Sequence, residues 1–139
     1  MNLPGLRLVV PGTPQDAWWQ LRQAITSDEP IIVIEHELLY FDKGDVDLAT
    51  EPPPIHQASV RRTGTDLTTV SYSRMANLAA AAVVALAEKN NQAEVIDLCS
   101  LSPIDWAICV ASLQKTRRRR QWRYFSLEHA ASWPRRQNG

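Results

Sequence analysis

The sequence lacks the features of a membrane or secreted protein. None of its apolar runs approaches the roughly 20 residues that cross a bilayer. Its amino terminus has no charged segment followed by an apolar core and a small-residue cleavage site. The two cysteines, Cys99 and Cys109, form no CxxC pair and have no histidine cluster nearby, which argues against a zinc motif or a disulfide framework. We therefore expect a cytoplasmic protein with reduced, partly buried thiols.

Glycine is also scarce, and this limits the chemistry that the chain can perform alone. The 5 glycines are scattered and form neither a Gly-x-Gly-x-x-Gly motif nor a phosphate-binding glycine-lysine loop. A Gly-x-Ser-x-Gly nucleophile motif is also missing from the sequence. At 139 residues and 45% hydrophobic content, the chain is long enough for one ordinary domain. A self-contained nucleotide site is not expected.

Charge is balanced overall but divided along the chain. Residues 1–114 carry 7 basic and 14 acidic side chains, whereas residues 115–139 carry 8 basic and 1 acidic side chain. Arginines and aromatic residues alternate in the segment 117–139, a composition found in segments that bind nucleic acids. Most charge runs are solvated tails, so a disordered basic tail is our expectation and a nucleic-acid-binding protein is the weaker alternative.

Between residues 67 and 106 the chain alternates strand and helix patterns, which is typical of an α/β fold with a parallel sheet. Ser73 is the expected N-cap of the first helix, and Ser102-Pro103-Ile104-Asp105 predicts the start of the second. Asn90-Asn91 is suited to ending the first helix. The predicted elements are a strand at 67–73, a helix at 74–89, a strand buried on both faces at 93–98 and a helix start at 100–106. The first helix should rest on the sheet through Met75, Leu78, Ala79, Ala82, Val83 and Leu86.

A second strand-helix-strand unit is predicted upstream, with strands at 6–10 and 31–34 around a helix that begins at Thr13-Pro14. The strand at 31–34 consists of apolar residues only, so we expect it to be buried. The inner face of the helix should contain Ala17, Trp18, Leu21, Ala24 and Ile25. Glu35-His36-Glu37 follows the second strand at the carboxyl end, where open sheets place their chemistry. Alternation along an extended chain separates His36 from both glutamates, so a structural hydrogen-bonding role is favoured over a metal or catalytic role.

The periodic pattern is lost between the two units. Residues 38–57 contain the stiff spacer Pro52-Pro53-Pro54 and are predicted to be a linker. A strand at 58–62 and a turn at 63–66 then lead into the second unit. The residues alone thus predict an α/β protein made of two partial units.

Several segments, in order, resemble a known family. The segments are PGLRLVVPGTPQDAWWQLRQAI, DEPIIVIEHELLY, GTDLTTVSYSRM, AEVIDLCSLSPIDW and ASLQKT. Over residues 4–116 they are similar to motifs of the beta subunit of the thiamine-dependent decarboxylase component of 2-oxoacid dehydrogenase complexes, of the pyruvate dehydrogenase type. The resemblance implies four parts: the end of a transketolase-like pyrimidine-binding domain at 1–37, a linker at 38–57, part of a transketolase C-terminal-like domain at 58–116, and a divergent basic tail at 117–139.

The resemblance also implies a function for the parent enzyme. In this family, alpha and beta subunits hold thiamine diphosphate and magnesium at their interface, decarboxylate a 2-oxoacid oxidatively and pass the acyl group to lipoyl groups of an acyltransferase core. The family's cofactor-contacting residues precede the position of Met1, so no catalytic or cofactor-binding residue is assigned to this chain. We expect a fragment that is inactive alone and does not bind the cofactor. The substrate, whether pyruvate, a branched-chain 2-oxoacid or acetoin, stays open.

The resemblance also includes part of a potassium site. Some relatives bind potassium at the end of the helix that corresponds to residues 14–26. The matching positions here are Ala24, Ile25, Ser27 and Glu29. Ser27 and Glu29 replace the family's Asp and Asn at this place, so the potassium site is the least supported part of the resemblance.

Two further departures concern position 99 and the end of the chain. Cys99 stands where the family usually carries an arginine. After Thr116 the family pattern stops, and we expect the arginine-rich segment to be either the translation of a shifted reading frame or a selected basic tail. A non-catalytic interaction module that caps a partner subunit is the remaining alternative to a dehydrogenase fragment.

Overall fold

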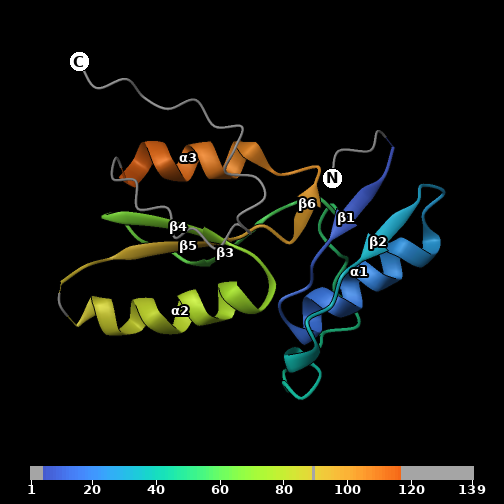
Figure 1. Ribbon diagram of the computed structural model, residues 1–139, viewed down its shortest axis with the longest axis horizontal. Helices are drawn as coiled ribbons and strands as arrows, with labels where there is room; N and C mark the ends of the chain where they lie inside the picture. The colour runs from blue at the N-terminus through green and yellow to red at the C-terminus, as the bar shows by residue number, and fades with distance from the viewer. Residues whose placement is uncertain (1–4, 89, 117–139) are drawn as a thin grey trace.

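The computed structural model describes residues 5–88 and 90–116. The predicted basic tail at 117–139 lies outside these residues. The described chain forms two three-stranded sheets with three α-helices around them (Figure 1). None of the described helices is long and apolar enough to span a bilayer. The predicted α/β fold is therefore confirmed.

The first sheet combines strands from both ends of the described chain. Its order is β2-β1-β6, with β1 at Arg7–Val9, β2 at Ile31–Val33 and β6 at Ser100–Ser102. β1 and β2 are parallel and are connected through α1, Pro14–Thr26, whereas β6 is antiparallel to β1. The two predicted units are thus joined by backbone hydrogen bonds.

The second sheet has the order β3-β5-β4, with β3 at Ser59–Arg62, β4 at Leu67–Ser71 and β5 at Ala93–Asp97. β4 runs parallel to β5 and β3 runs antiparallel to it, so the strands on either side of the predicted turn do not pair with each other. Helices α2, Ser73–Ala87, and α3, Trp106–Thr116, cover opposite faces of this sheet (Figure 1). β5 is buried along its whole length, as predicted.

The second sheet, β3-β5-β4, is packed against apolar side chains on both faces. On the α3 side, the buried cluster contains Ala58, Ile96, Leu98 and Cys109. On the α2 side, it contains Val83, Ala93 and Val95. Thr68 adds a buried polar contact, because its Oγ1 lies 2.7 Å from Ser112 Oγ and 2.8 Å from Thr116 Oγ1 and so ties β4 to α3.

The predicted starts of both helices in the second unit are wrong in detail. Ser73 is the first residue of α2, with φ +49, and its hydroxyl donates to the Pro11 carbonyl at 2.9 Å instead of accepting from the helix. Ser102 ends β6, and its hydroxyl donates to the Leu6 carbonyl at 3.1 Å. Asp105 caps α3 instead, since its Oδ1 accepts from Ile108 N at 3.3 Å. In both cases the serine hydroxyl binds the first unit rather than its own helix.

The predicted inner face of α2 is wrong in part. Ala76 and Val83 are buried and Ala79 packs against the cluster that contains Val83, but Met75 and Leu78 are 37% and 44% exposed. Ala82 is exposed as well. Because α2 is apolar around most of its circumference, the spacing of apolar residues does not specify which side meets the sheet. The predicted end at Asn90 is consistent with its left-handed conformation, at φ +58.

For α1 and β2 the predicted burial is wrong for most of the large apolar residues. Asp16 and Gln20 are buried, whereas Trp18, Leu21 and Ile25 are 39%, 51% and 75% exposed. Helix α1 turns its polar side toward the second sheet because hydrogen-bonding partners lie there. The predicted buried strand at 31–34 is also half open, with Ile32 and Ile34 40% and 48% exposed at the edge of the sheet.

Candidate functional site

A buried ion cluster joins the two sheets. Asp97, at the end of β5, is fully buried, and its Oδ2 accepts hydrogen bonds from Arg61 Nε at 3.1 Å and Arg61 Nη2 at 2.8 Å. Arg61 Nη2 also pairs with Oδ2 of Asp16, in the first turn of α1. One guanidinium from β3 therefore binds carboxylates from both units.

The local sequence explains how Asp16 reaches the cluster. Thr13 caps α1, because its Oγ1 accepts from Asp16 N at 3.1 Å and donates to Asp16 Oδ2 at 2.7 Å. Gly12 lies just before this cap, and a Cβ there would be 2.8 Å from Asp97 Oδ2. The close approach of residue 12 to the carboxylate thus requires glycine.

Burial and charge act against each other in this cluster. Burial lowers the pKa of Arg61, but the charges of Asp16 and Asp97 outweigh it and hold that pKa above its usual range. Burial raises the pKa of Asp97, and the Arg61 charge only partly opposes the rise. The guanidinium therefore stays protonated, and the cluster acts as an electrostatic link between the units.

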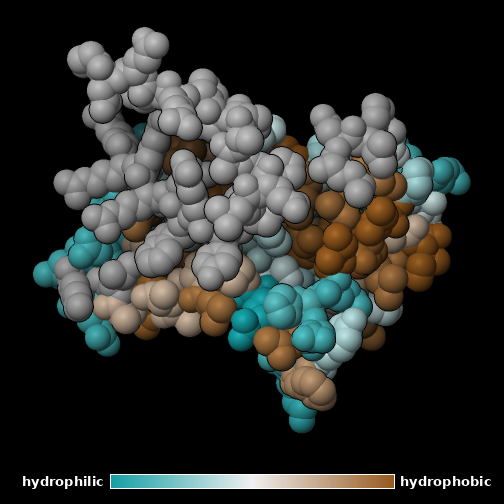
Figure 2. All heavy atoms as spheres, in the orientation of Figure 1, coloured by the Kyte–Doolittle hydropathy of each residue, from teal (hydrophilic) through white to brown (hydrophobic). Residues whose placement is uncertain are grey.

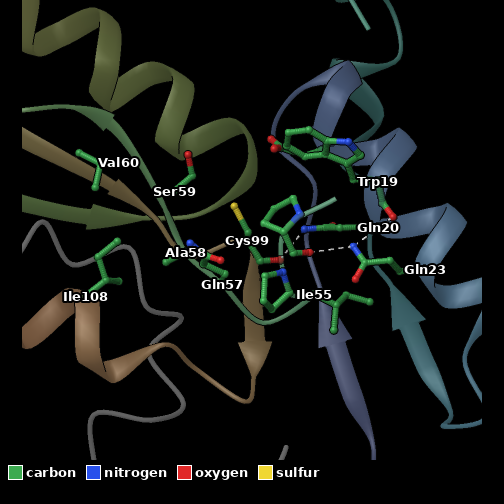
Figure 3. Close-up of a pocket in the computed structure, with 13 residues that line it drawn as sticks. Trp19, Gln20, Gln23, Ile55, Gln57, Ala58, Ser59, Val60, Cys99 and Ile108 are labelled. Carbon is green, nitrogen blue, oxygen red and sulfur yellow. Dashed lines mark hydrogen bonds between the residues drawn. The ribbon is translucent and has the colours of Figure 1, made fainter. Parts of the chain in front are cut away.

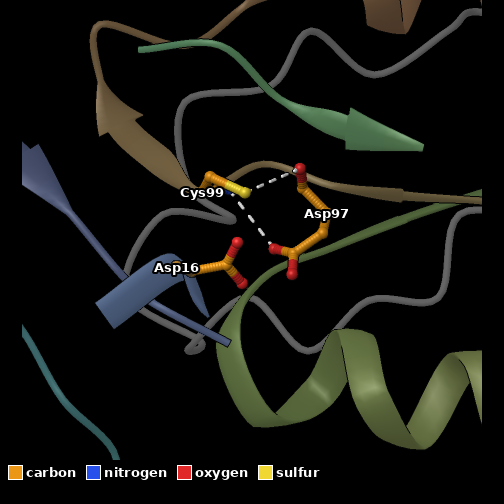
Figure 4. A group of neighbouring side chains, drawn as sticks. All are labelled: Asp16, Asp97 and Cys99. Atoms are coloured by element: carbon orange, nitrogen blue, oxygen red, sulfur yellow. Dashed lines mark hydrogen bonds between the residues drawn. The ribbon is translucent and has the colours of Figure 1, made fainter. Parts of the chain in front are cut away.

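Cys99 is adjacent to the two carboxylates (Figure 4). It takes a left-handed conformation, at φ +55, as the chain passes from β5 to β6. Its Sγ lies 3.5 Å from the Asp97 carbonyl. Burial, followed by the charges of Asp97 and Asp16, raises the pKa of the thiol, so it is neither a ready nucleophile nor a ready metal ligand.

The ligand-type atoms of Asp16, Asp97 and Cys99 all lie within 4.8 Å of one another. The position that a cation would occupy beside the carboxylates is taken by the Arg61 guanidinium. Position 99 carries a cysteine where the resemblance expects an arginine, and the guanidinium beside the carboxylates is that of Arg61 on β3. The trio is therefore better described as part of an ion pair network than as a metal centre.

A crevice of about 290 Å³ opens beside this cluster, between α1, the linker, β3 and the Cys99 turn (Figure 3). Gln20 Nε2 donates to the Cys99 carbonyl at 3.0 Å and Gln23 Nε2 to the Pro53 carbonyl at 3.1 Å. Two buried polar atoms of lining residues, Trp19 Nε1 and Gln20 Oε1, have no hydrogen-bond partner among the described residues.

Among the described residues, the side-chain hydrogen bonds of the polar cluster at Glu35-His36-Glu37 are local. His36 Nδ1 accepts from Leu38 N at 3.2 Å and so caps the short 3-10 helix η1, Glu37–Leu39. Glu35 Oε2 accepts from the Tyr40 hydroxyl at 3.3 Å. All three residues of the cluster are exposed, and these contacts are structural ones.

The predicted potassium residues lie at the end of α1. Ser27 is its C-cap, and its Oγ accepts from Glu29 N at 3.1 Å. The Glu29 carboxylate pairs with Arg7 Nε, and Ile25 is 75% exposed beside Ala24. These donors fit potassium poorly because their carboxylate already binds a cation. The potassium site stays a prediction.

Thiamine diphosphate and magnesium also lack a place among the described residues. Those residues provide one cluster of metal-ligating side chains, Asp16, Asp97 and Cys99, and Arg61 fills it. The donor set therefore does not fit a magnesium diphosphate group.

Sequence reasoning missed the ion cluster. Asp97 follows a buried strand at its carboxyl end, a position that could have been selected for that reason alone. Asp16 lies in the first turn after the predicted helix start at Thr13-Pro14, where a carboxylate is common for helix stability alone. Arg61 gave no signal, because nothing in the local sequence indicates that β3 would lie beside β5.

Comparison with known proteins agrees with the resemblance. The transketolase C-terminal domain family matches residues 56–120. The beta subunit of the pyruvate dehydrogenase E1 component of Leifsonia xyli is 45% identical over 114 residues, which cover 82% of this chain and 34% of that protein. The beta subunit of 3-methyl-2-oxobutanoate dehydrogenase of Mycobacterium tuberculosis is 42% identical over 119 residues, covering 85% and 34%. The chain belongs to the 2-oxoacid dehydrogenase beta-subunit family.

This beta-subunit chain spans about a third of the length of those relatives. Solved structures agree on the fold. A split-gene transketolase, described as an inactive beta4 tetramer, superposes with a TM-score of 0.69 at 24% sequence identity. The superposition covers 82% of this chain and 37% of the transketolase chain. A transketolase from Pichia stipitis gives a TM-score of 0.53 at 15% identity, with 81% and 17% covered. The predicted transketolase-like fold is thus confirmed.

Proposed function

We propose that this chain is the scaffold segment of a beta subunit that, with an alpha subunit, decarboxylates a 2-oxoacid using thiamine diphosphate and magnesium and passes the acyl group to an acyltransferase core. The observation that supports it best is the 114-residue match at 45% identity. A match of that length cannot lie within residues 56–139, so it includes part of the upstream unit as well.

Within such an enzyme, the chain's own residues would hold the two units together. Arg61 binds Asp16 and Asp97 across the two units. Ser73 and Asn77 of α2 donate to the carbonyls of Pro11 and Gly12 at 2.9 and 2.7 Å. These contacts link the segments proposed to end the pyrimidine-binding domain, 1–37, and to begin the C-terminal domain, 58–116, on either side of the linker at 38–57.

The proposal places the protein in the cytoplasm and gives the isolated chain no activity. Two experiments test it together. Titration of the 139-residue chain with thiamine diphosphate and magnesium in a calorimeter should give no saturable heat, and co-expression with an alpha subunit of this family should give a complex that co-purifies. Cofactor binding tighter than about millimolar would contradict the assignment of the cofactor contacts to other residues. Failure to bind any alpha subunit would contradict the beta-subunit role.

The names of the relatives narrow the substrate to a few small oxo compounds but do not identify it. The relatives are named for pyruvate, for 3-methyl-2-oxobutanoate and, in Cupriavidus necator, for acetoin at 37% identity. We propose a 2-oxoacid, since two of these three names denote one. Turnover of pyruvate, 3-methyl-2-oxobutanoate and acetoin by a reconstituted enzyme would identify the substrate.

A non-catalytic interaction module is the second candidate. It is favoured by the exposed apolar side of α1, formed by Trp18, Leu21 and Ile25. Apolar side chains also gather over the region of β1 and β2 (Figure 2). A complex with an alpha subunit that forms readily but gains no activity, even when the rest of the beta subunit is supplied, would favour this candidate.

A further inference from the structure

The outer edge of β4 carries backbone groups that need a partner. In the order β3-β5-β4, no described strand lies on the outer side of β4. The Ser71 carbonyl accepts from Leu98 N at 2.9 Å and so points toward β5. Because successive residues of a strand direct their N–H and C=O groups to alternate sides, Thr68 and Val70 direct theirs outward. Thr68 is only 3% exposed, so bulk water is a poor partner for its outward groups.

Helix α2 extends apolar side chains past this edge on one face of the sheet (Figure 1). Ala79 and Leu67 of β4 pack against the same buried cluster, so the Ala79 side of α2 lies toward β4. Met75 and Ala82 are the helical neighbours of Ala79 on its far side, away from Asn77, and both are exposed. The exposed half of the apolar stripe of α2 therefore overhangs the space beside β4.

Helix α3 does the same on the opposite face. Its buried side contacts the sheet through Cys109, and Ile108 lies on the flank toward β3, where it lines the crevice with Val60. Trp106 and Val110 occupy the other flank and are 66% and 47% exposed. The outer edge of β4 thus lies between two apolar helix flanks, the environment of a strand that is buried on both faces.

The chain topology indicates which segment enters this space. α3 follows β5 and covers the face opposite α2 (Figure 1). A strand-helix-strand crossover is almost always right-handed, so a strand that follows α3 belongs on the far side of β4 rather than beside β3. Thr116, the last residue of α3, has its Oγ1 2.8 Å from Thr68 Oγ1, near the start of β4. The chain therefore leaves α3 where a strand parallel to β4 would begin.

The sequence after Thr116 has a suitable stretch at a suitable distance. Residues 122–127 read WRYFSL and contain three aromatic residues, which favour strands. Residues 117–121 would connect them to α3, a length typical of helix-to-strand loops. Alternation along a strand would direct Trp122 and Tyr124 to one face and Phe125 and Leu127 to the other, so both helix flanks would meet apolar side chains.

We propose that residues 122–127 of this chain add to the outer edge of β4 as a parallel strand between α2 and α3. Their backbone groups pair with those of Thr68 and Val70, and their side chains cover the apolar flanks of both helices. The inference goes beyond the proposed dehydrogenase role and does not depend on it.

The test follows amide hydrogen exchange by NMR in the full 139-residue chain. Tyr124→Pro and Phe125→Pro are made separately, because one of these two neighbouring residues must direct its N–H to β4. At least one of the two should speed exchange of the Thr68 and Val70 amides about tenfold or more. Thr69 and Ser71 point toward β5 and should change by less than about twofold, which makes them the internal reference. Unchanged exchange of the outward amides in both variants overturns the proposal.

A control and a direct measurement complete the experiment. Ala131→Pro, outside the proposed strand, should leave exchange of the outward amides unchanged. In the unmodified chain, nuclear Overhauser effects should connect amide protons of residues 122–127 with those of Thr68 and Val70, a result that does not require either proline variant to fold. Their absence overturns the proposal. Protection of the outward amides that is lost on dilution also overturns it, since a second copy of the chain would then occupy the edge.

Discussion

Arg61 donates two hydrogen bonds to a single oxygen of Asp97, Oδ2, at 3.1 and 2.8 Å. Asp97 is fully buried, and the Arg61 side chain is 20% exposed. The guanidinium also reaches Asp16 of α1. The pair therefore belongs both to the core of the second sheet and to the contact between the two sheets, so its loss should affect the whole fold.

Arg61→Leu should lower the free energy of unfolding by about 3 kcal/mol, because it leaves two buried carboxylates without their cation. Denaturant unfolding followed by circular dichroism measures this. Arg62→Leu, on the same strand, is the matched control and should change the free energy by less than about 0.5 kcal/mol. Adding Asp97→Asn to Arg61→Leu should restore part of the loss. An Arg61→Leu protein as stable as the control would mean that the cluster contributes little.

Gly64→Ala should destabilise the protein by at least about 2 kcal/mol, in the range for forcing extra volume into a packed site. A Cβ at position 64 would lie 2.3 Å from the carbonyl carbon of Ala93 and 2.4 Å from Glu94 N, both backbone atoms of β5. Gly44→Ala is the control, since its Cβ would meet only Pro14 at 3.4 Å. Thermal unfolding of both variants measures the difference. Equal melting temperatures would contradict the close approach of residue 64 to the backbone of β5.

Local patterns in the sequence predicted most elements but not how they face one another. The buried run of β5 and the cap at Thr13 are local features, and both were predicted correctly. The burial of α1 was not, since Gln20 is buried through its bond to the Cys99 carbonyl, 79 residues away. Likewise Ser73 resembles a helix cap but binds the Pro11 carbonyl. Contacts of this kind depend on tertiary structure, which periodicity does not encode.

The same limit applies to the candidate site. The resemblance correctly predicted the family and the transketolase-like fold, and it marked position 99, a cysteine here, as different from the family. It could not supply Arg61 as the cation for Asp16 and Asp97, because that pairing requires the antiparallel register of β3 on β5. The crevice next to Trp19 has no signature in the sequence for the same reason, since its walls come from four separate segments.

Stability should fall in acid through Glu94. Burial raises the pKa of this carboxyl, but hydrogen bonds from Lys115, Ser112 and Gly64 N outweigh that effect and hold it below its ordinary value of 4.5. A lowered pKa stabilises the folded state above the unfolded value, and this contribution is lost as the pH falls through the folded pKa. Glu94→Gln should cost about 1.5 kcal/mol at pH 7, typical of a lost hydrogen bond to a charged group. The difference between the two proteins should shrink below pH 4.5.

The matched control for that experiment is Glu88→Gln, on an exposed residue just after α2. Its free energy of unfolding should follow that of the unmodified protein at every pH. Urea denaturation at several values between pH 3 and pH 7 provides the comparison. A Glu94→Gln protein that keeps a constant deficit into acid would show that Glu94 acts through packing rather than through its charge.

The edge of the first sheet should drive self-association. Among the described strands, β2 pairs with β1 alone, and Ile32 and Ile34, on and just after this strand, are 40% and 48% exposed. An apolar edge strand offers unpaired backbone groups to another chain, and a lysine placed there opposes such pairing. Ile32→Lys should therefore lower the association constant at least about tenfold in sedimentation equilibrium. Val84→Lys, which removes a 56% exposed valine from α2 instead, should leave association unchanged. If both lysine variants reduce association equally, general surface charge rather than the β2 edge controls it.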